Sequence, residues 1–123
     1  MTSVVIPWRS GCPYRERALA WVLGRWAERF PTFDVVLGVH DDGPWCKAAA
    51  VADGLSKVAD GALILADADV WPLRPEALTD AVGALSDHGW AIPHGDVQRL
   101  TETASEAFMA DLPLPPRPWL QTP

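Results

Sequence analysis

The chain has 123 residues, of which 49% are hydrophobic and 21% are charged. That size and composition fit one globular domain with a real hydrophobic core, and they exclude disorder over the whole length. Acidic residues outnumber basic ones by 16 to 10, and the net charge of −6 argues against nucleic acid and anionic membranes as partners. No apolar run is long enough to span a membrane and no signal-peptide pattern is present, so we expect a cytoplasmic protein.

Short apolar runs alternate with helical patterns along the chain, which predicts an α/β fold with a mostly parallel, Rossmann-like sheet and helices on both faces. We expect the first strand to lie between the second and third, and a ligand to bind where the strand order reverses, at the carboxyl ends of the first and third strands. The predicted strands are residues 4–6, 35–39, 62–66 and 90–92, and the predicted helices are residues 14–30, 45–59, 75–86 and 97–110.

The C-terminal residues 111–123 differ in composition from the rest and hold five prolines. We therefore divide the chain into a domain of residues 1–110 and a Pro-rich tail. Such a tail either forms a polyproline II ligand for a partner or packs as an extended arm on its own domain.

The main candidate for chemistry is the pair Asp67 and Asp69, directly after the third predicted strand. Residues two apart on an extended segment point the same way, so both carboxylates can face one point beyond the sheet edge. Such oxygen ligands suit Mg²⁺ or Mn²⁺ bridged to phosphate oxygens. The alternative is a solvated turn in which aspartate caps the next segment. An isolated Asp-x-Asp is common in a chain this rich in aspartate, but its placement directly after an apolar strand gives the metal interpretation equal standing with the turn.

Further polar residues follow the other predicted strands. Asp41 and Asp42 end the second strand, where a carboxylate can accept a hydrogen bond from a base or a ribose, although Asp-Asp-Gly-Pro is also good turn sequence. Arg9 follows the first strand and Lys47 begins the second helix, and either can offset phosphate charge or simply be a surface residue.

Aromatic and histidine residues near the same edge leave two interpretations open. Trp8, Trp45 and Trp71 each follow a strand, and each ring can stack on a base or pack in the core. His94 follows the fourth predicted strand and is either a metal ligand or a loop residue without a role.

In order along the chain, these motifs resemble the family 2-like glycosyltransferases of the GT-A fold. Residues 4–7, Val-Val-Ile-Pro, resemble the opening strand of that family, and residues 39–43, Val-His-Asp-Asp-Gly, resemble its strand ending in an Asp-Asp-Gly turn. Residues 63–70, Leu-Ile-Leu-Ala-Asp-Ala-Asp-Val, resemble its apolar strand with the Asp-x-Asp motif. The resemblance covers roughly residues 3–100, the nucleotide-binding half of such enzymes.

The resemblance implies a nucleotide-diphosphate-sugar donor, with a UDP-sugar the commonest choice, and Mn²⁺ or Mg²⁺ as cofactor. By analogy, Asp41 or Asp42 contacts the base, Asp67 contacts the ribose or the metal, and Asp69 binds the metal at the diphosphate. Lys47 replaces a basic family residue, but Ala48 stands where the family often has asparagine. The implied nucleotide-binding set is Pro7, Arg9, Asp41, Asp42, Lys47 and Asp67, and the implied metal set is Asp67, Asp69 and His94.

Members of this family usually continue into an acceptor-binding half that supplies a catalytic base. No motif of that kind follows Asp96, so the resemblance assigns no catalytic residue, and we expect a truncated form or one completed by another chain or a second copy. Two alternatives stay open: an interaction protein that keeps the fold without catalysis, and a metal-dependent nucleotidyltransferase, which also uses paired carboxylates.

Overall fold

The computed structural model describes residues 1–112, and the chain divides into two compact units, Met1–Ala91 and Ile92–Pro123. The Pro-rich segment from Pro113 onward lies outside the described residues, so the two predictions for the tail stay predictions. The first unit holds β1 (Ser3–Trp8), α1 (Pro13–Arg29), β2 (Asp34–Val39), α2 (Lys47–Leu55), β3 (Leu63–Leu65) and α3 (Glu76–Ala84), and the second holds α4 (Glu102–Met109).

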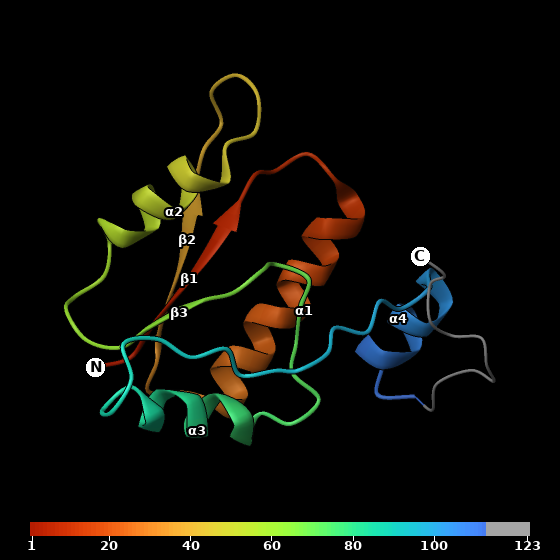
Figure 1. The fold of residues 1–123 in the computed structure, drawn as a ribbon. Helices are drawn as coiled ribbons and strands as arrows, with labels where there is room; N and C mark the ends of the chain where they lie inside the picture. Colours follow the sequence, from red (N-terminus) through yellow and green to blue (C-terminus); the bar gives the residue numbers. More distant parts are fainter. Residues whose placement is uncertain (113–123) are drawn as a thin grey trace. The chain divides into compact units, whose positions relative to one another are not determined.

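The sheet of the first unit has three parallel strands in the order β2-β1-β3, which confirms the predicted α/β class and strand order. Val4 pairs with Val35 on one side and with Ile64 on the other. Every residue of β1 is buried, as expected for a central strand of continuous apolar character. The strands run the same way, so their carboxyl ends share one edge (Figure 1).

One face of the sheet packs against α1. Side chains alternate along β1, so Val4, Ile6 and Trp8 share this face and join Val22 and Trp26 of α1 in the main core cluster. Pro13 lies in the first turn of α1, where a proline costs no hydrogen bond, and the helix ends before Phe30. Burying each such aliphatic side chain contributes about 1.5–3 kcal/mol.

The opposite face packs against α2, which contacts β1 and β2 (Figure 1). Here the contact is nearly backbone to backbone. A Cβ on Gly38 of β2 would lie 2.0 Å from the carbonyl oxygen of Ala50, and a Cβ on Gly54 would lie 2.4 Å from Cγ1 of Val5. The two glycines therefore set how closely α2 approaches the sheet.

Pro7 ends the pairing of β1 with β3. Ser3 N–H donates to the carbonyl of Ala62, and the carbonyl of Val5 accepts from the N–H of Ala66, so alternate residues of β1 face β3. The next residue in that series is Pro7, which has no N–H to donate. β1 continues to pair with β2 as far as Trp8, opposite Val39. On the other side, no hydrogen bond from residue 7 can extend the pairing with β3. The sheet therefore opens between β1 and β3 at its carboxyl edge.

An aromatic cluster closes the α1 side of the core. The ring of Trp71 lies edge-on to Trp26, with 5.1 Å between centroids, and to Trp21 at 6.3 Å. Phe30 lies 5.5 Å from Trp26 and stacks on Phe33 at 4.8 Å. These rings tie the segment after β3 to the end of α1.

Several predicted boundaries are wrong. Residues 90–92 form no strand and are exposed, because a run of three residues between Gly89 and Pro93 finds no partner strand. α2 is shorter than residues 45–59: residue 46 is extended, and the Ser56 hydroxyl bonds to the Asp53 carbonyl in the turn that ends the helix. α3 covers Glu76–Ala84 rather than residues 75–86, because hydrogen-bonded turns follow it.

The second unit contains α4, which begins five residues later than predicted. Thr101 has extended backbone dihedrals, and its hydroxyl accepts a hydrogen bond from the N–H of Ala104 at 3.2 Å, so it caps the helix and prevents an earlier start. Within residues 1–112, no helix combines the length and apolar character needed to cross a membrane.

Candidate functional site at the carboxyl edge of the sheet

Arg9 joins the end of β1 to the loop after β2. Its guanidinium donates to the backbone carbonyls of Asp41, at 3.0 Å, and Gly43, at 2.5 Å. Gly43 adopts a left-handed conformation, with φ of 60°, which a glycine accepts without strain. The loop is therefore held through its backbone, while the side chains of Asp41 and Asp42 are left exposed.

Lys47 joins the start of α2 to the segment after β3. Its ammonium Nζ lies 3.0 Å from Oδ1 of Asp67, and both side chains are more than half exposed. The structure thus brings together two predicted residues that lie 20 positions apart in sequence.

The Asp-x-Asp segment is anchored by its middle residue. Ala68 is 1% exposed and belongs to the main core cluster, while Asp67 and Asp69 on either side are exposed. Ala68 and Asp69 lie in a turn after β3, so the extended segment expected from the sequence ends at Asp67. Both carboxylates are therefore held outside the core at the sheet edge.

The donor set fits a divalent cation only with help from a ligand. Across the described residues, no group of three or more His, Cys, Asp and Glu side chains is arranged to hold a metal. Mg²⁺ in proteins commonly takes one or two carboxylates and fills its remaining positions with substrate phosphate oxygens and water. Asp67 and Asp69 supply that number of carboxylates.

The charge at this edge also favours a cation with an anionic ligand. The four predicted aspartates at this edge, Asp41, Asp42, Asp67 and Asp69, outnumber the two predicted basic residues, Arg9 and Lys47. A diphosphate alone would meet net negative charge there, and a divalent cation would neutralise it.

The three tryptophans predicted near this edge have different environments. Trp8 is 7% exposed and packs in the core, with the Arg15 guanidinium 5.8 Å from its ring centroid, and Trp71 belongs to the aromatic cluster. Trp45 is 42% exposed, in the loop between Gly43 and Lys47. Of the three, Trp45 offers the most open ring to a ligand.

Two predicted residues have other surroundings. Pro7 is buried within β1 opposite Gly38, where it shapes the strand edge as described above. His94 is exposed and belongs to the second unit, whereas the other predicted site residues belong to the first.

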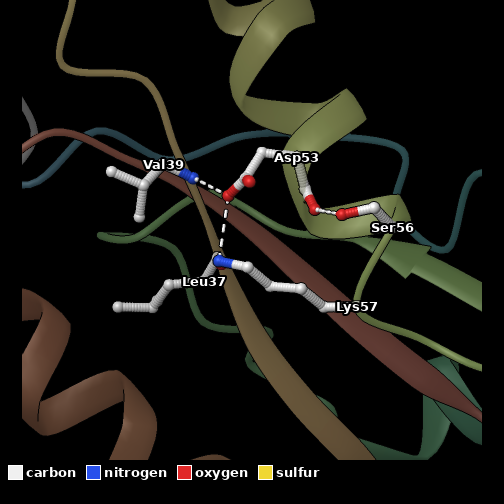
Figure 2. Close-up of polar contacts among 5 residues, drawn as sticks. All are labelled: Leu37, Val39, Asp53, Ser56 and Lys57. Carbon is white, nitrogen blue, oxygen red and sulfur yellow. Dashed lines mark hydrogen bonds and ion pairs between the residues drawn. The ribbon is translucent and has the colours of Figure 1, made fainter.

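Asp53 and Lys57 make structural contacts between α2 and β2 that the sequence analysis did not predict. Asp53 Oδ2 accepts a hydrogen bond from the N–H of Val39, the last residue of β2, at 2.8 Å, and lies 2.9 Å from Lys57 Nζ (Figure 2). Lys57 also donates to the carbonyl of Leu37 at 2.9 Å. The Val39 hydrogen bond, followed by Lys57, lowers the pKa of Asp53 below its ordinary value of 3.8. These contacts hold α2 to the end of β2, next to the loop that carries Asp41. A carboxylate on the sheet-facing side of a helix, four residues before a lysine, is the signal that could have found them.

An open hollow of about 430 Å³ lies between the end of α1 and the start of α3, and none of the predicted site residues lines it. Its walls are Glu28, Arg29, Phe30, Pro75, Glu76, Thr79 and Asp80. The carboxyl edge, where the predicted residues meet, stays the best-supported candidate site. Comparison of the chain with family models, with curated proteins and with solved structures gives no match.

Proposed function

We propose that this chain binds a nucleotide-diphosphate sugar at the carboxyl edge of its sheet through a divalent cation, as the resemblance to GT-A glycosyltransferases implies. The observation that supports the proposal is the Lys47–Asp67 contact, because the Lys47 ammonium, a group that can bind phosphate, lies beside the Asp-x-Asp segment. The Arg9 contact with the Asp41–Gly43 backbone adds the end of the neighbouring strand to the same edge.

The proposed roles follow from chemistry and position. Asp69 holds Mn²⁺ or Mg²⁺, and Asp67 contacts the same metal or the ribose. Lys47 offsets charge on the diphosphate. Asp41 or Asp42 accepts a hydrogen bond from the base, and the exposed Trp45 ring offers it a stacking surface.

For glycosyl transfer, a bound divalent cation would offset the negative charge that develops on the leaving diphosphate. The chain's own residues position the donor: Arg9 fixes the loop that carries Asp41 and Asp42, and Ala68 anchors both carboxylates. No residue is assigned as the acceptor's base, so the proposal covers donor binding, with transfer as the associated reaction class.

Calorimetry with UDP and GDP, with and without Mn²⁺, tests this proposal. We expect Mn²⁺-dependent binding that Asp69→Asn weakens at least tenfold. Asp87→Asn is the matched control, because it removes an exposed carboxylate from the turn after α3. Equal binding with and without the metal, or equal losses in the two variants, would refute the assignment.

A second candidate function is association with a partner chain or a second copy. β3 is an edge strand, and on the face where α2 covers β1 and β2 its side chains Leu63 and Leu65 are 37% and 59% exposed. An edge strand with exposed leucines is a surface to which another strand can add. Light scattering against concentration tests it: association that Leu65→Glu abolishes favours this function, and a monomer at all concentrations rejects self-association.

A further inference from the structure

We infer that Lys47 pairs with Asp67 when no ligand is bound. When a divalent cation and a diphosphate bind together, Lys47 releases this carboxylate to the cation and moves to the diphosphate. This inference rests on the proposed function and adds how the two ligands depend on each other. The diphosphate and the cation bind cooperatively, and the cation alone binds less well than the two carboxylates would otherwise allow.

The first step is competition for one oxygen. Lys47 Nζ lies 3.0 Å from Oδ1 of Asp67, at hydrogen-bonding distance, so the ammonium uses a lone pair that a metal ligand needs. The two side chains are 60% and 53% exposed, and an exposed ion pair of this type is weak and easily exchanged. The competition therefore lowers the affinity for a cation by a few fold and does not block the site.

Once released from Asp67, Lys47 needs another anion near the start of α2. It is the first residue of α2, whose initial turn contains no acidic residue and whose preceding residue, Cys46, makes no side-chain cap. A positive charge at a helix N-terminus is disfavoured unless an anion lies near it. When a cation takes Asp67, the anion that satisfies Lys47 must come from the ligand, and a diphosphate brings it.

The third step is thermodynamic. If the diphosphate draws Lys47 away from Asp67, it raises the affinity for the cation, and the cation must raise the affinity for the diphosphate by the same factor. Lys47 then affects the two ligands in opposite directions: it opposes the cation alone and supports the diphosphate.

The chain offers a matched control, because Lys57 is its only other lysine and also pairs with an aspartate. Lys47→Met and Lys57→Met change the net charge equally, but Lys57 contacts Asp53 on α2 and Leu37 on β2 rather than the Asp-x-Asp segment. Mn²⁺ binding is measured on the full chain by the electron paramagnetic resonance signal of the free ion, first alone and then with UDP.

We expect Lys47→Met to bind Mn²⁺ alone about twofold to fivefold more tightly and to bind UDP with Mn²⁺ at least fivefold more weakly, while Lys57→Met changes neither. In an Asp67→Asn background, Lys47→Met should no longer tighten Mn²⁺. Unchanged or weaker Mn²⁺ binding by Lys47→Met, an equal gain in Lys57→Met, or changes of the same sign for both ligands would overturn the inference. Absence of UDP binding by the wild-type chain would instead reject the proposed function, and the experiments with Mn²⁺ alone would still decide the role of Lys47.

Discussion

Gly54 of α2 packs directly over Gly38 of β2: a Cβ on Gly54 would lie 3.3 Å from the Cα of Gly38 and 2.4 Å from the Val5 side chain. Gly54→Ala should therefore lower stability by about 1–3 kcal/mol, because buried, β-branched Val5 has few rotamers in which to move away. Urea unfolding followed by circular dichroism measures this.

Gly24→Ala is the matched control for that substitution. Gly24 also lies inside a helix, but it is exposed and a Cβ there would meet nothing within 4 Å. This variant should gain about 0.5–1 kcal/mol from helix propensity. Two alanine substitutions with effects of the same sign would contradict the close packing of α2 on the sheet.

Asp53→Asn should show a pH-dependent loss of stability. The Val39 N–H and Lys57 lower the pKa of Asp53 in the folded state, so the ionised carboxylate stabilises the fold at pH values above the ordinary 3.8. That stabilisation is lost as the pH falls through the lowered folded-state value. The difference in unfolding free energy between wild type and Asp53→Asn should be constant at neutral pH and should shrink below about pH 4. A difference that persists unchanged at pH 2 would show that charge is not its source.

Much of the fold was predictable, because apolar runs alternating with helical patterns indicate a parallel α/β sheet, and the continuous apolar run of β1 suits its central place. The ends of the helices and strands were less predictable. Thr101 fixes the start of α4 through a side-chain cap, which the spacing of apolar residues does not indicate. The candidate site was proposed from the sequence as a set of residues that follow strands. Its contacts were not, because Arg9 binds backbone carbonyls, which every residue possesses and no sequence pattern marks.

Arg9→Met should loosen the loop of residues 40–46 without unfolding the sheet. The methionine keeps the apolar stem and removes both hydrogen bonds to the loop carbonyls. Loss of these bonds should lower the free energy of local opening by about 1–2 kcal/mol and raise the rate of chymotrypsin cleavage after exposed Trp45 about fivefold to thirtyfold. Arg74→Met, which changes an exposed arginine before α3, is the control. Equal cleavage rates in the two variants would mean that Arg9 does not hold the loop.

The tryptophans Trp71 and Trp45 should separate stability from binding. Trp71→Ala removes edge-on contacts with Trp21 and Trp26 and should cost about 2–4 kcal/mol of stability.

Trp45→Ala should leave the thermal midpoint nearly unchanged, since the side chain is 42% exposed, and should weaken nucleotide binding by about 1–3 kcal/mol if the ring stacks on the base. Unchanged nucleotide affinity in Trp45→Ala would remove this residue from the site.

The proline that ends β1 also controls which alignment of β3 is possible. If β3 moved by two residues so that Leu65 lay opposite residue 7, every side chain would keep its face, and the apolar pattern alone would not oppose the shift. The shifted ladder, however, would need an N–H from Pro7 to the carbonyl of Ile64 and would lose that bond. In a strand of three residues this is a large share of the pairing. The absence of an N–H at Pro7 therefore disfavours the shifted alignment while the chain folds. It favours the alignment in which Asp67 lies within reach of Lys47.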